Sequence, residues 1–231
     1  MNERDETDAT GAVDAADTTL AQLIERARAL ASRGERVILG ITGAPGAGKS
    51  TLAERIVAEL GDELAVLVPM DGYHLANVVL DDLGYRARKG APHTFDAFGY
   101  LSLMRRIHAQ RENAAAGIDG VVYAPQFRRD LEEPVGSAIP VHPETPLVVT
   151  EGNYLLLEEE PWPHVRALVD ETWFLAPDES QRLAWLIDRH VRFGRSPDEA
   201  RERSLGSDQR NAEAITATAG RADAVFRLTG V

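Results

Sequence analysis

The sequence contains no cysteine, so disulfide bonds and cysteine-ligated zinc sites are excluded. It has no uninterrupted apolar run of the length that a membrane-spanning helix needs, and its N-terminus has no basic-then-apolar signal. We therefore expect a cytoplasmic protein without a membrane partner. The net charge of −12 argues against a nucleic-acid-binding surface, because such a surface must be basic.

Lysine is almost absent as well. All 25 basic residues are arginine except Lys49 and Lys89. Neither lysine follows an asparagine, so the sequence has no N-K-x-D guanine-specificity motif, which argues against a regulatory GTPase. Because the sequence uses arginine at nearly every other basic position, the lysine at position 49 is expected to have a specific role.

Lys49 lies in the most informative segment of the chain, a G-x-x-x-x-G-K-S phosphate loop over residues 43–50. An apolar run at 37–41 precedes the loop and a helical pattern follows it, which is the context that a phosphate loop requires. Backbone N–H groups of such a loop and of the following helix converge on phosphate, Lys49 neutralises the β- and γ-phosphates, and the Ser50 hydroxyl binds Mg²⁺. The nucleotide-binding residues predicted from this motif are Gly43, Ala44, Pro45, Gly46, Ala47, Gly48, Lys49, Ser50 and Thr51, and the predicted cofactors are ATP and Mg²⁺.

Strand and helix patterns alternate along the rest of the chain. Strands are expected at 36–42, 65–68, 147–150, 172–175 and 224–228. Helices are expected from Thr18 to a stop at Gly34, at 49–60, 98–114 and 178–193, and from Ser196 to 219 with a break at Gly206. Residues 72–96 have no clean period, and 118–145 are expected to form short strands and loops. Uniformly apolar strands that alternate with helices predict an α/β fold, a three-layer P-loop NTPase with a parallel sheet and helices on both faces. The acidic residues 1–17 are expected to be a disordered leader before a single domain over 18–231.

Two acidic residues follow predicted strands, Asp71 after 65–68 and Glu151 after 147–150. Ligands of parallel α/β sheets bind beyond the carboxyl ends of the strands, which is also where the phosphate loop lies. Phosphoryl transfer needs one carboxylate to orient and deprotonate an acceptor hydroxyl and another to hold Mg²⁺ directly or through water. The residues alone do not decide which acid has which role.

Four arginines lie on or just after the predicted helix at 178–193: Arg182, Arg189, Arg192 and Arg195. The first three are spaced seven and three residues apart, so they are expected to share one helix face. Arginines that close over a transferred phosphoryl group neutralise its charge and exclude water. A lid over about 186–200 is therefore expected. The alternative is an exposed helix face paired with nearby acids.

Several motifs occur in an order that resembles a known family. These are the phosphate loop, Asp71-Gly72-Tyr73-His74, the segment from Arg88 to Pro92 with Phe95-Asp96, Glu151-Gly152-Asn153-Tyr154, and the arginines at 189–195. The series resembles the uridine kinase, pantothenate kinase and phosphoribulokinase group of P-loop kinases. It is most similar to a bacterial branch described as nucleoside-kinase-like or fructose-transport-system-kinase-like. The acidic segment departs from that of uridine kinases proper, so the resemblance does not identify the substrate.

The resemblance implies that Asp71 is the catalytic base, that Glu151 lies by the metal or the acceptor, and that the lid includes Arg189, Arg192 and Arg195. It also places four residues at the border of the acceptor pocket, within an insertion over about 72–145: His74, Arg88, Lys89 and Tyr123. The expected activity is transfer of the γ-phosphoryl group of ATP to a hydroxyl of a small molecule, a sugar or nucleoside first and a pantothenate-like acid alcohol next. An NTP-dependent switch or ATPase whose acceptor is water is the competing hypothesis. The sequence does not determine the oligomeric state, and a homodimer is compatible with it.

Overall fold

The structure is a computed structural model that describes residues 14–115 and 120–230. The strands are β1 (Ala16–Thr19), β2 (Val37–Gly43), β3 (Ala65–Pro69), β4 (Val122–Arg128), β5 (Glu133–Val141), β6 (Leu147–Glu151), β7 (Glu171–Leu175) and β8 (Ala224–Thr229). The helices are α1 (Leu20–Ala31), α2 (Lys49–Leu60), α3 (Asn77–Asp82), α4 (Ala97–Ala115), α5 (Trp162–Arg166), α6 (Glu179–Arg192), α7 (Pro197–Leu205) and α8 (Ser207–Thr216). Within the described part of the chain, no helix combines the length and the apolar character that crossing a bilayer demands.

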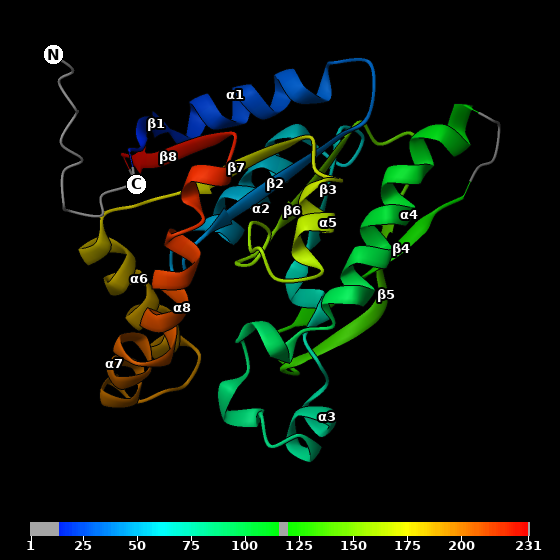
Figure 1. The fold of residues 1–231 in the computed structure, drawn as a ribbon. Coiled ribbons are helices and arrows are strands. Elements are labelled where there is room, and N and C mark those ends of the chain that lie inside the picture. Colours follow the sequence, from blue (N-terminus) through cyan, green and yellow to red (C-terminus); the bar gives the residue numbers. More distant parts are fainter. Residues whose placement is uncertain (1–13, 116–119, 231) are drawn as a thin grey trace, which may run out of the picture.

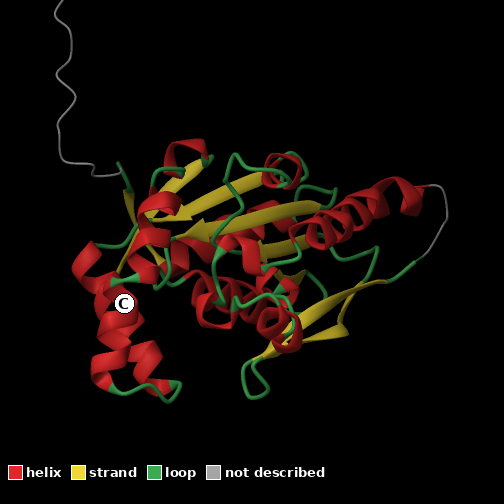
Figure 2. Cartoon of the chain, turned by 60° about the horizontal axis from the view of Figure 1, so that its bottom comes forward, coloured by secondary structure: helices red, strands yellow, loops and turns green. Residues whose placement is uncertain are grey.

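A parallel six-stranded sheet forms the centre of the molecule, in the order β1-β8-β7-β2-β6-β3. β2 lies between β6 and β7, with Val37 paired to Leu147 and Leu39 paired to Glu171. Figure 2 shows the strands of this sheet side by side, with helices packed around them. The predicted parallel sheet is confirmed.

Helices cover both faces of the sheet, which confirms the three-layer prediction (Figure 1). Successive strand residues point to opposite faces, so Ile38 belongs to one core and its neighbours in β2 to the other. On one side α4, α5 and α8 supply Met104, Val165 and Ile215 to the core. On the other side α1 and α2 pack their apolar residues on the sheet.

A separate antiparallel hairpin of β4 and β5 stands beside the main sheet. It corresponds to the short strands expected within 118–145. The aperiodic segment 72–96 holds the short helix α3 and three 3₁₀ turns, Met70–Tyr73, Arg86–Arg88 and Pro92–Thr94. Turns this short produce no repeating hydrophobic pattern, which explains why the segment has no period.

Helices α6, α7 and α8 form the C-terminal arm of the molecule, at the lower left of Figure 1. Ser196 caps α7 through a capping box with Glu199, as the sequence predicts. α7 ends at Leu205 and α8 begins at Ser207, so the predicted break at Gly206 is confirmed.

Two short elements were not predicted. β1 pairs in parallel with β8 along the sheet edge, and α5 follows Pro161. Because Ala16 and Asp17 belong to β1, the disordered leader expected over 1–17 is wrong at these two residues. Residues 1–13 of that leader lie outside the described residues.

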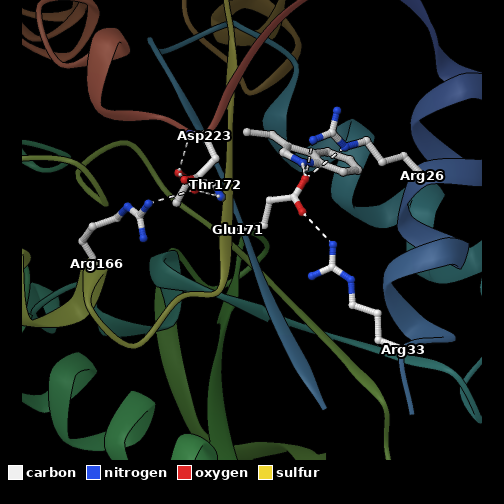
Figure 3. A network of polar contacts seen from close by, with 7 residues as sticks. Arg26, Arg33, Arg166, Glu171, Thr172 and Asp223 are labelled. Carbon is white, nitrogen blue, oxygen red and sulfur yellow. Dashed lines mark hydrogen bonds and ion pairs between the residues drawn. The ribbon is translucent and has the colours of Figure 1, made fainter. Parts of the chain in front are cut away.

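A buried carboxylate fixes the start of β7 (Figure 3), whereas the other end of this strand, at Leu175, pairs with Gly43 of the phosphate loop. Glu171 accepts hydrogen bonds from Arg26 at 2.6 Å, from Arg33 at 3.3 Å and from the indole of Trp173 at 2.8 Å. On the other side of the strand, the Asp223 carboxylate accepts from the backbone N–H and the hydroxyl of the next residue along β7. These bonds join α1, β7 and the segment before β8, so they hold the sheet together rather than take part in the site.

Candidate functional site

The phosphate loop connects β2 to α2 and has the conformation that its glycines permit. Gly46 and Gly48 have φ of 84° and 88°, in the region that residues with a Cβ rarely adopt. A Cβ on Gly46 would lie 2.7 Å from the Arg182 carbonyl oxygen, because the loop packs closely against α6. Lys49 begins α2, is 7% exposed and donates a hydrogen bond to the Ala44 carbonyl at 3.1 Å. The loop is thus held closed over its own lysine.

Arg182 supports this loop and does not belong to a lid. Its side chain is buried, and it donates to the Pro45 carbonyl at 2.7 Å while also binding Glu179 and Gln209. The expectation that Arg182 acts together with the later arginines is therefore wrong. Arg182 lies in the first turn of α6, and from there its guanidinium contacts the backbone of the phosphate loop.

Glu151 ends β6 and lies directly against the start of α2. The Ser50 hydroxyl donates to Glu151 Oε1 at 3.1 Å, and Glu151 is buried. Burial, and to a lesser extent the charge of Asp71, raises the pKa of Glu151 above that of an ordinary glutamate. Burial also lowers the pKa of Lys49, against the attraction of Glu151.

The oxygen atoms of Ser50 and Glu151 fit a magnesium ion. Mg²⁺ prefers hard oxygen ligands and is commonly held by one or two protein groups together with substrate phosphates and water. A hydroxyl and a carboxylate that already contact each other, beside a phosphate loop, supply such a pair. Within the described residues there is no cluster of three or more histidine, cysteine and acidic residues that would form an all-protein metal cage.

Asp71 lies in the 3₁₀ turn after β3, at the same sheet edge as the phosphate loop and Glu151. The order β2-β6-β3 places these three strand ends side by side, which confirms the expected juxtaposition. The Asp71 carboxylate lies 3.6 Å from Arg129 and 3.9 Å from His74 Nδ1. Asp71 thus faces the hairpin side of the site, whereas Glu151 contacts the Ser50 hydroxyl.

Two cavities meet at these residues. One, of about 460 Å³, extends from Lys49 past Asp71 to His74 and Lys89, and its outer wall includes Arg189. The other, of about 570 Å³, lies between α2, β3 and the hairpin and is lined by residues such as Val57, Leu67 and Ile139. The residues common to both cavities are Ser50, Asp71, Phe127, Arg129 and Glu151. Each volume is in the range of small-molecule sites.

The lid arginines divide into two groups. Arg189 and Arg195 line the first cavity, and the charge of Arg189 contributes to the lowered pKa of Lys49. Arg192 does not reach either cavity; it is exposed and pairs with Asp188 at 2.6 Å, one turn earlier on α6. The structure therefore brings Arg189 and Arg195 to the site and leaves Arg192 on the outer side of the helix.

The four residues predicted at the acceptor pocket divide in the same way. His74 and Lys89 line the first cavity. Arg88 is exposed and lines neither cavity, and Tyr123, 51% exposed on β4, also points away from both. Of this group, the structure places only His74 and Lys89 at the site.

Sequence reasoning missed the contribution of the hairpin. Phe127 and Arg129 line both cavities, and the Arg129 guanidinium lies 5.5 Å from the ring of Phe193, which follows α6. Arg203 of α7 crosses to the other wall and donates to the Lys89 carbonyl at 2.9 Å. Phe127 lies on β4 and Arg129 in the turn just after it, and only the fold shows that this end of the hairpin meets the cavities.

Comparison with known proteins agrees with this geometry. Residues 38–230 match the model of the phosphoribulokinase / uridine kinase family. "Putative uridine kinase C227.14" of Schizosaccharomyces pombe is 34% identical over 210 residues, which cover 86% of each chain. "Uncharacterized protein YggC" of Escherichia coli K12 is 31% identical, with 84% of this chain and 78% of YggC covered.

A crystal structure supports the same assignment. The crystal structure of a "putative fructose transport system kinase" from Silicibacter sp. TM1040 matches this structure with a TM-score of 0.75 and 34% sequence identity. The match covers 90% of this chain and 99% of the other. With a family match over most of the chain and relatives above 30% identity over more than three quarters of their length, this protein belongs to the phosphoribulokinase / uridine kinase family of P-loop kinases.

Proposed function

We propose that this protein transfers the γ-phosphoryl group of ATP to a hydroxyl group of a small molecule, a sugar or a nucleoside. The observation that carries the proposal is the convergence of Lys49, Ser50, Glu151 and Asp71 on one cavity. A phosphate loop alone is compatible with hydrolysis. A second carboxylate, facing away from the loop and into a space of small-molecule size, favours transfer to an acceptor.

The geometry supports a separate role for each group. The loop backbone and Lys49 bind the β- and γ-phosphates, and Arg189 approaches from the opposite wall. Ser50 and Glu151 would hold Mg²⁺, which when bound neutralises charge on the phosphate oxygens. Asp71 orients the acceptor hydroxyl and takes its proton as the oxygen attacks phosphorus, because its carboxylate faces the acceptor end of the cavity.

A substrate panel tests this function. ATP consumption is measured with Mg²⁺, with and without sugars, nucleosides, pantothenate and D-glycerate, and the phosphorylated product is identified by mass spectrometry. We expect one class of acceptor to raise ATP consumption well above the acceptor-free rate. ATP consumption that no acceptor changes, with inorganic phosphate as the product, would instead establish an ATPase.

A further inference from the structure

The ring of His74 has a defined tautomer in this structure. Its Nδ1 lies 2.8 Å from the backbone carbonyl oxygen of Asp71. A carbonyl oxygen can only accept a hydrogen bond, so Nδ1 carries the proton. Burial lowers the pKa of His74 below that of an ordinary histidine, which favours the neutral ring with a single proton. Nε2 therefore holds an unshared electron pair and is a hydrogen-bond acceptor.

Nε2 is the end of the ring that remains available. His74 lines the first cavity with its side chain 10% exposed, and no described residue forms a hydrogen bond with Nε2. Phe95 and Phe127 pack against the ring at centroid distances of 4.0 Å and 4.9 Å. The ring is thus held in place, and its unbonded acceptor atom belongs to a side chain that lines the cavity.

Lys89 supplies the complementary donor. Its ammonium group has three N–H bonds, of which two go to Asn77 Oδ1 at 2.7 Å and to the Glu132 carbonyl at 2.6 Å. Nζ lies 4.9 Å from the centroid of Phe127, the ring that also contacts His74. Nζ forms no third hydrogen bond and no ion pair with a described residue, so one N–H remains for a ligand in the cavity that Lys89 lines.

The aromatic surfaces at this end of the cavity are already occupied. Phe127 has Lys89 over its ring and His74 against it, and Phe95 packs on His74 and, edge to face, on Tyr154. A nucleobase is commonly held by stacking on an aromatic face, and this wall offers a hydrogen-bond acceptor and donor in place of one. A hydroxyl group is the neutral group that donates and accepts through a single oxygen.

We propose, on the basis of the kinase function proposed above, that His74 Nε2 and Lys89 together recognise a second hydroxyl of the acceptor, next to the hydroxyl that Asp71 activates. The hydroxyl donates to Nε2 and accepts from the Lys89 ammonium. Asp71 and His74 are neighbours, with 3.9 Å between Oδ1 and Nδ1, so both recognised hydroxyls belong to the same small acceptor. The acceptor is then a polyhydroxy compound of the sugar type, bound through its diol and not through a base.

Matched substrate pairs test this proposal in the unmodified protein. The pairs are glycerol with propane-1,3-diol and D-ribose with 2-deoxy-D-ribose, with uridine as the nucleoside. A buried acceptor left without its partner costs about 1–3 kcal/mol, so we expect kcat/KM for glycerol and D-ribose, which carry the hydroxyl at C2, to exceed that of their deoxy partners by roughly 5- to 150-fold. Equal kcat/KM within each pair, or uridine strongly preferred over ribose, would overturn the proposal while leaving the kinase function intact. No phosphorylation of any acceptor would instead count against the kinase function.

Two substitutions assign the discrimination to these side chains. His74→Asn keeps a donor near the position of Nδ1 and removes Nε2, and Lys89→Met keeps most of the side-chain length and removes the charge. In each variant, the kcat/KM values of the two substrates of a pair should differ by no more than about threefold. The change should come chiefly from the acceptor KM, as expected for loss of a ground-state binding contact. The matched control is His93→Asn, an exposed histidine that lines neither cavity. A purely structural role would lower both members equally and leave the ratio unchanged, which would refute the assignment.

The tautomer can be examined without any acceptor. ¹⁵N chemical shifts of the histidine rings, with the His74 signals assigned by their loss in His74→Asn, distinguish a protonated Nδ1 from a protonated Nε2. We expect protonated Nδ1 and unprotonated Nε2 at neutral pH. A proton on Nε2 would make that atom a donor and would contradict the proposed contact.

Discussion

Replacing Asp71 with asparagine separates the two carboxylates of the site. The substitution keeps the size of the side chain and removes its ability to accept a proton. General-base catalysis contributes roughly 10²- to 10⁴-fold to a rate, so we expect kcat to fall by that factor. Affinity for ATP should be retained, because the phosphate contacts come from the loop and Lys49, while the Asp71 carboxylate lies beside Arg129 and His74.

The structure also predicts that this variant stays folded. The ion pair that it removes joins Asp71 to an Arg129 side chain that is 44% exposed, at 3.6 Å. Partly exposed pairs contribute about 0–1 kcal/mol, which corresponds to a change in Tm of at most roughly 4 °C for a chain of this size. A loss of turnover in Asp71→Asn can therefore be assigned to chemistry.

The assay pairs ATP turnover with nucleotide binding by calorimetry, for Asp71→Asn, Glu151→Gln and the control Asp82→Asn on the exposed side of α3. Glu151→Gln should weaken binding of Mg²⁺-ATP, since Glu151 contacts Ser50. If Asp71→Asn loses ATP binding together with turnover, while Glu151→Gln loses turnover alone, the roles are reversed and Glu151 is the base.

Further substitutions test other parts of the structure. Lys49→Ala should remove most transfer activity, roughly 10²-fold or more, and Lys49→Arg should also be poor in kinetic assays, because a planar guanidinium does not replace a buried ammonium. Arg189→Ala should lower kcat more than it raises the KM for ATP, because Arg189 lines the cavity. Arg192→Ala should match the unmodified enzyme, because Arg192 pairs with the exposed Asp188 outside the cavity. Equal kinetic defects in the two variants would contradict this difference in position. Glu171→Ala should cost about 1–3 kcal/mol and lower Tm by roughly 2–12 °C in calorimetry without changing KM, because it leaves a buried indole N–H unpaired. Because the folded-state pKa of His74 is lowered, its neutral ring contributes stability above pH 6.5 that is lost as the pH falls through the folded value. The Tm advantage of the unmodified protein over His74→Asn should therefore shrink in melts below pH 6.5, and a constant difference would argue against a buried neutral ring.

The sequence predicts the central part of the fold well because local signals and burial agree there. The helix expected at 49–60 has those bounds in the structure, since a glycine-rich loop defines its start and Gly61 its end. The uniformly apolar strands are equally clear. β1 was missed because a four-residue segment with no apolar alternation becomes a strand only through its pairing with β8 at the far end of the chain.

The site residues show the same limit. Lys49, Asp71 and Glu151 could be placed at one sheet edge from strand ends alone. Helical spacing grouped Arg182, Arg189 and Arg192, but their neighbours differ: a loop carbonyl, the cavity and an exposed aspartate. Which neighbour each side chain meets depends on tertiary packing, and a spacing rule contains no information about that packing.

The central position of β2 has a consequence for the order of folding. The strand that leads into the phosphate loop is made early in synthesis, yet its partners β6 and β7 both come from the second half of the chain. Loop closure over such distances is slow, and until it occurs the apolar residues of β2 have no sheet to join. A nascent chain that ends before β7 therefore cannot form the nucleotide site. Protection of the chain by ATP should appear late in synthesis and in a single step.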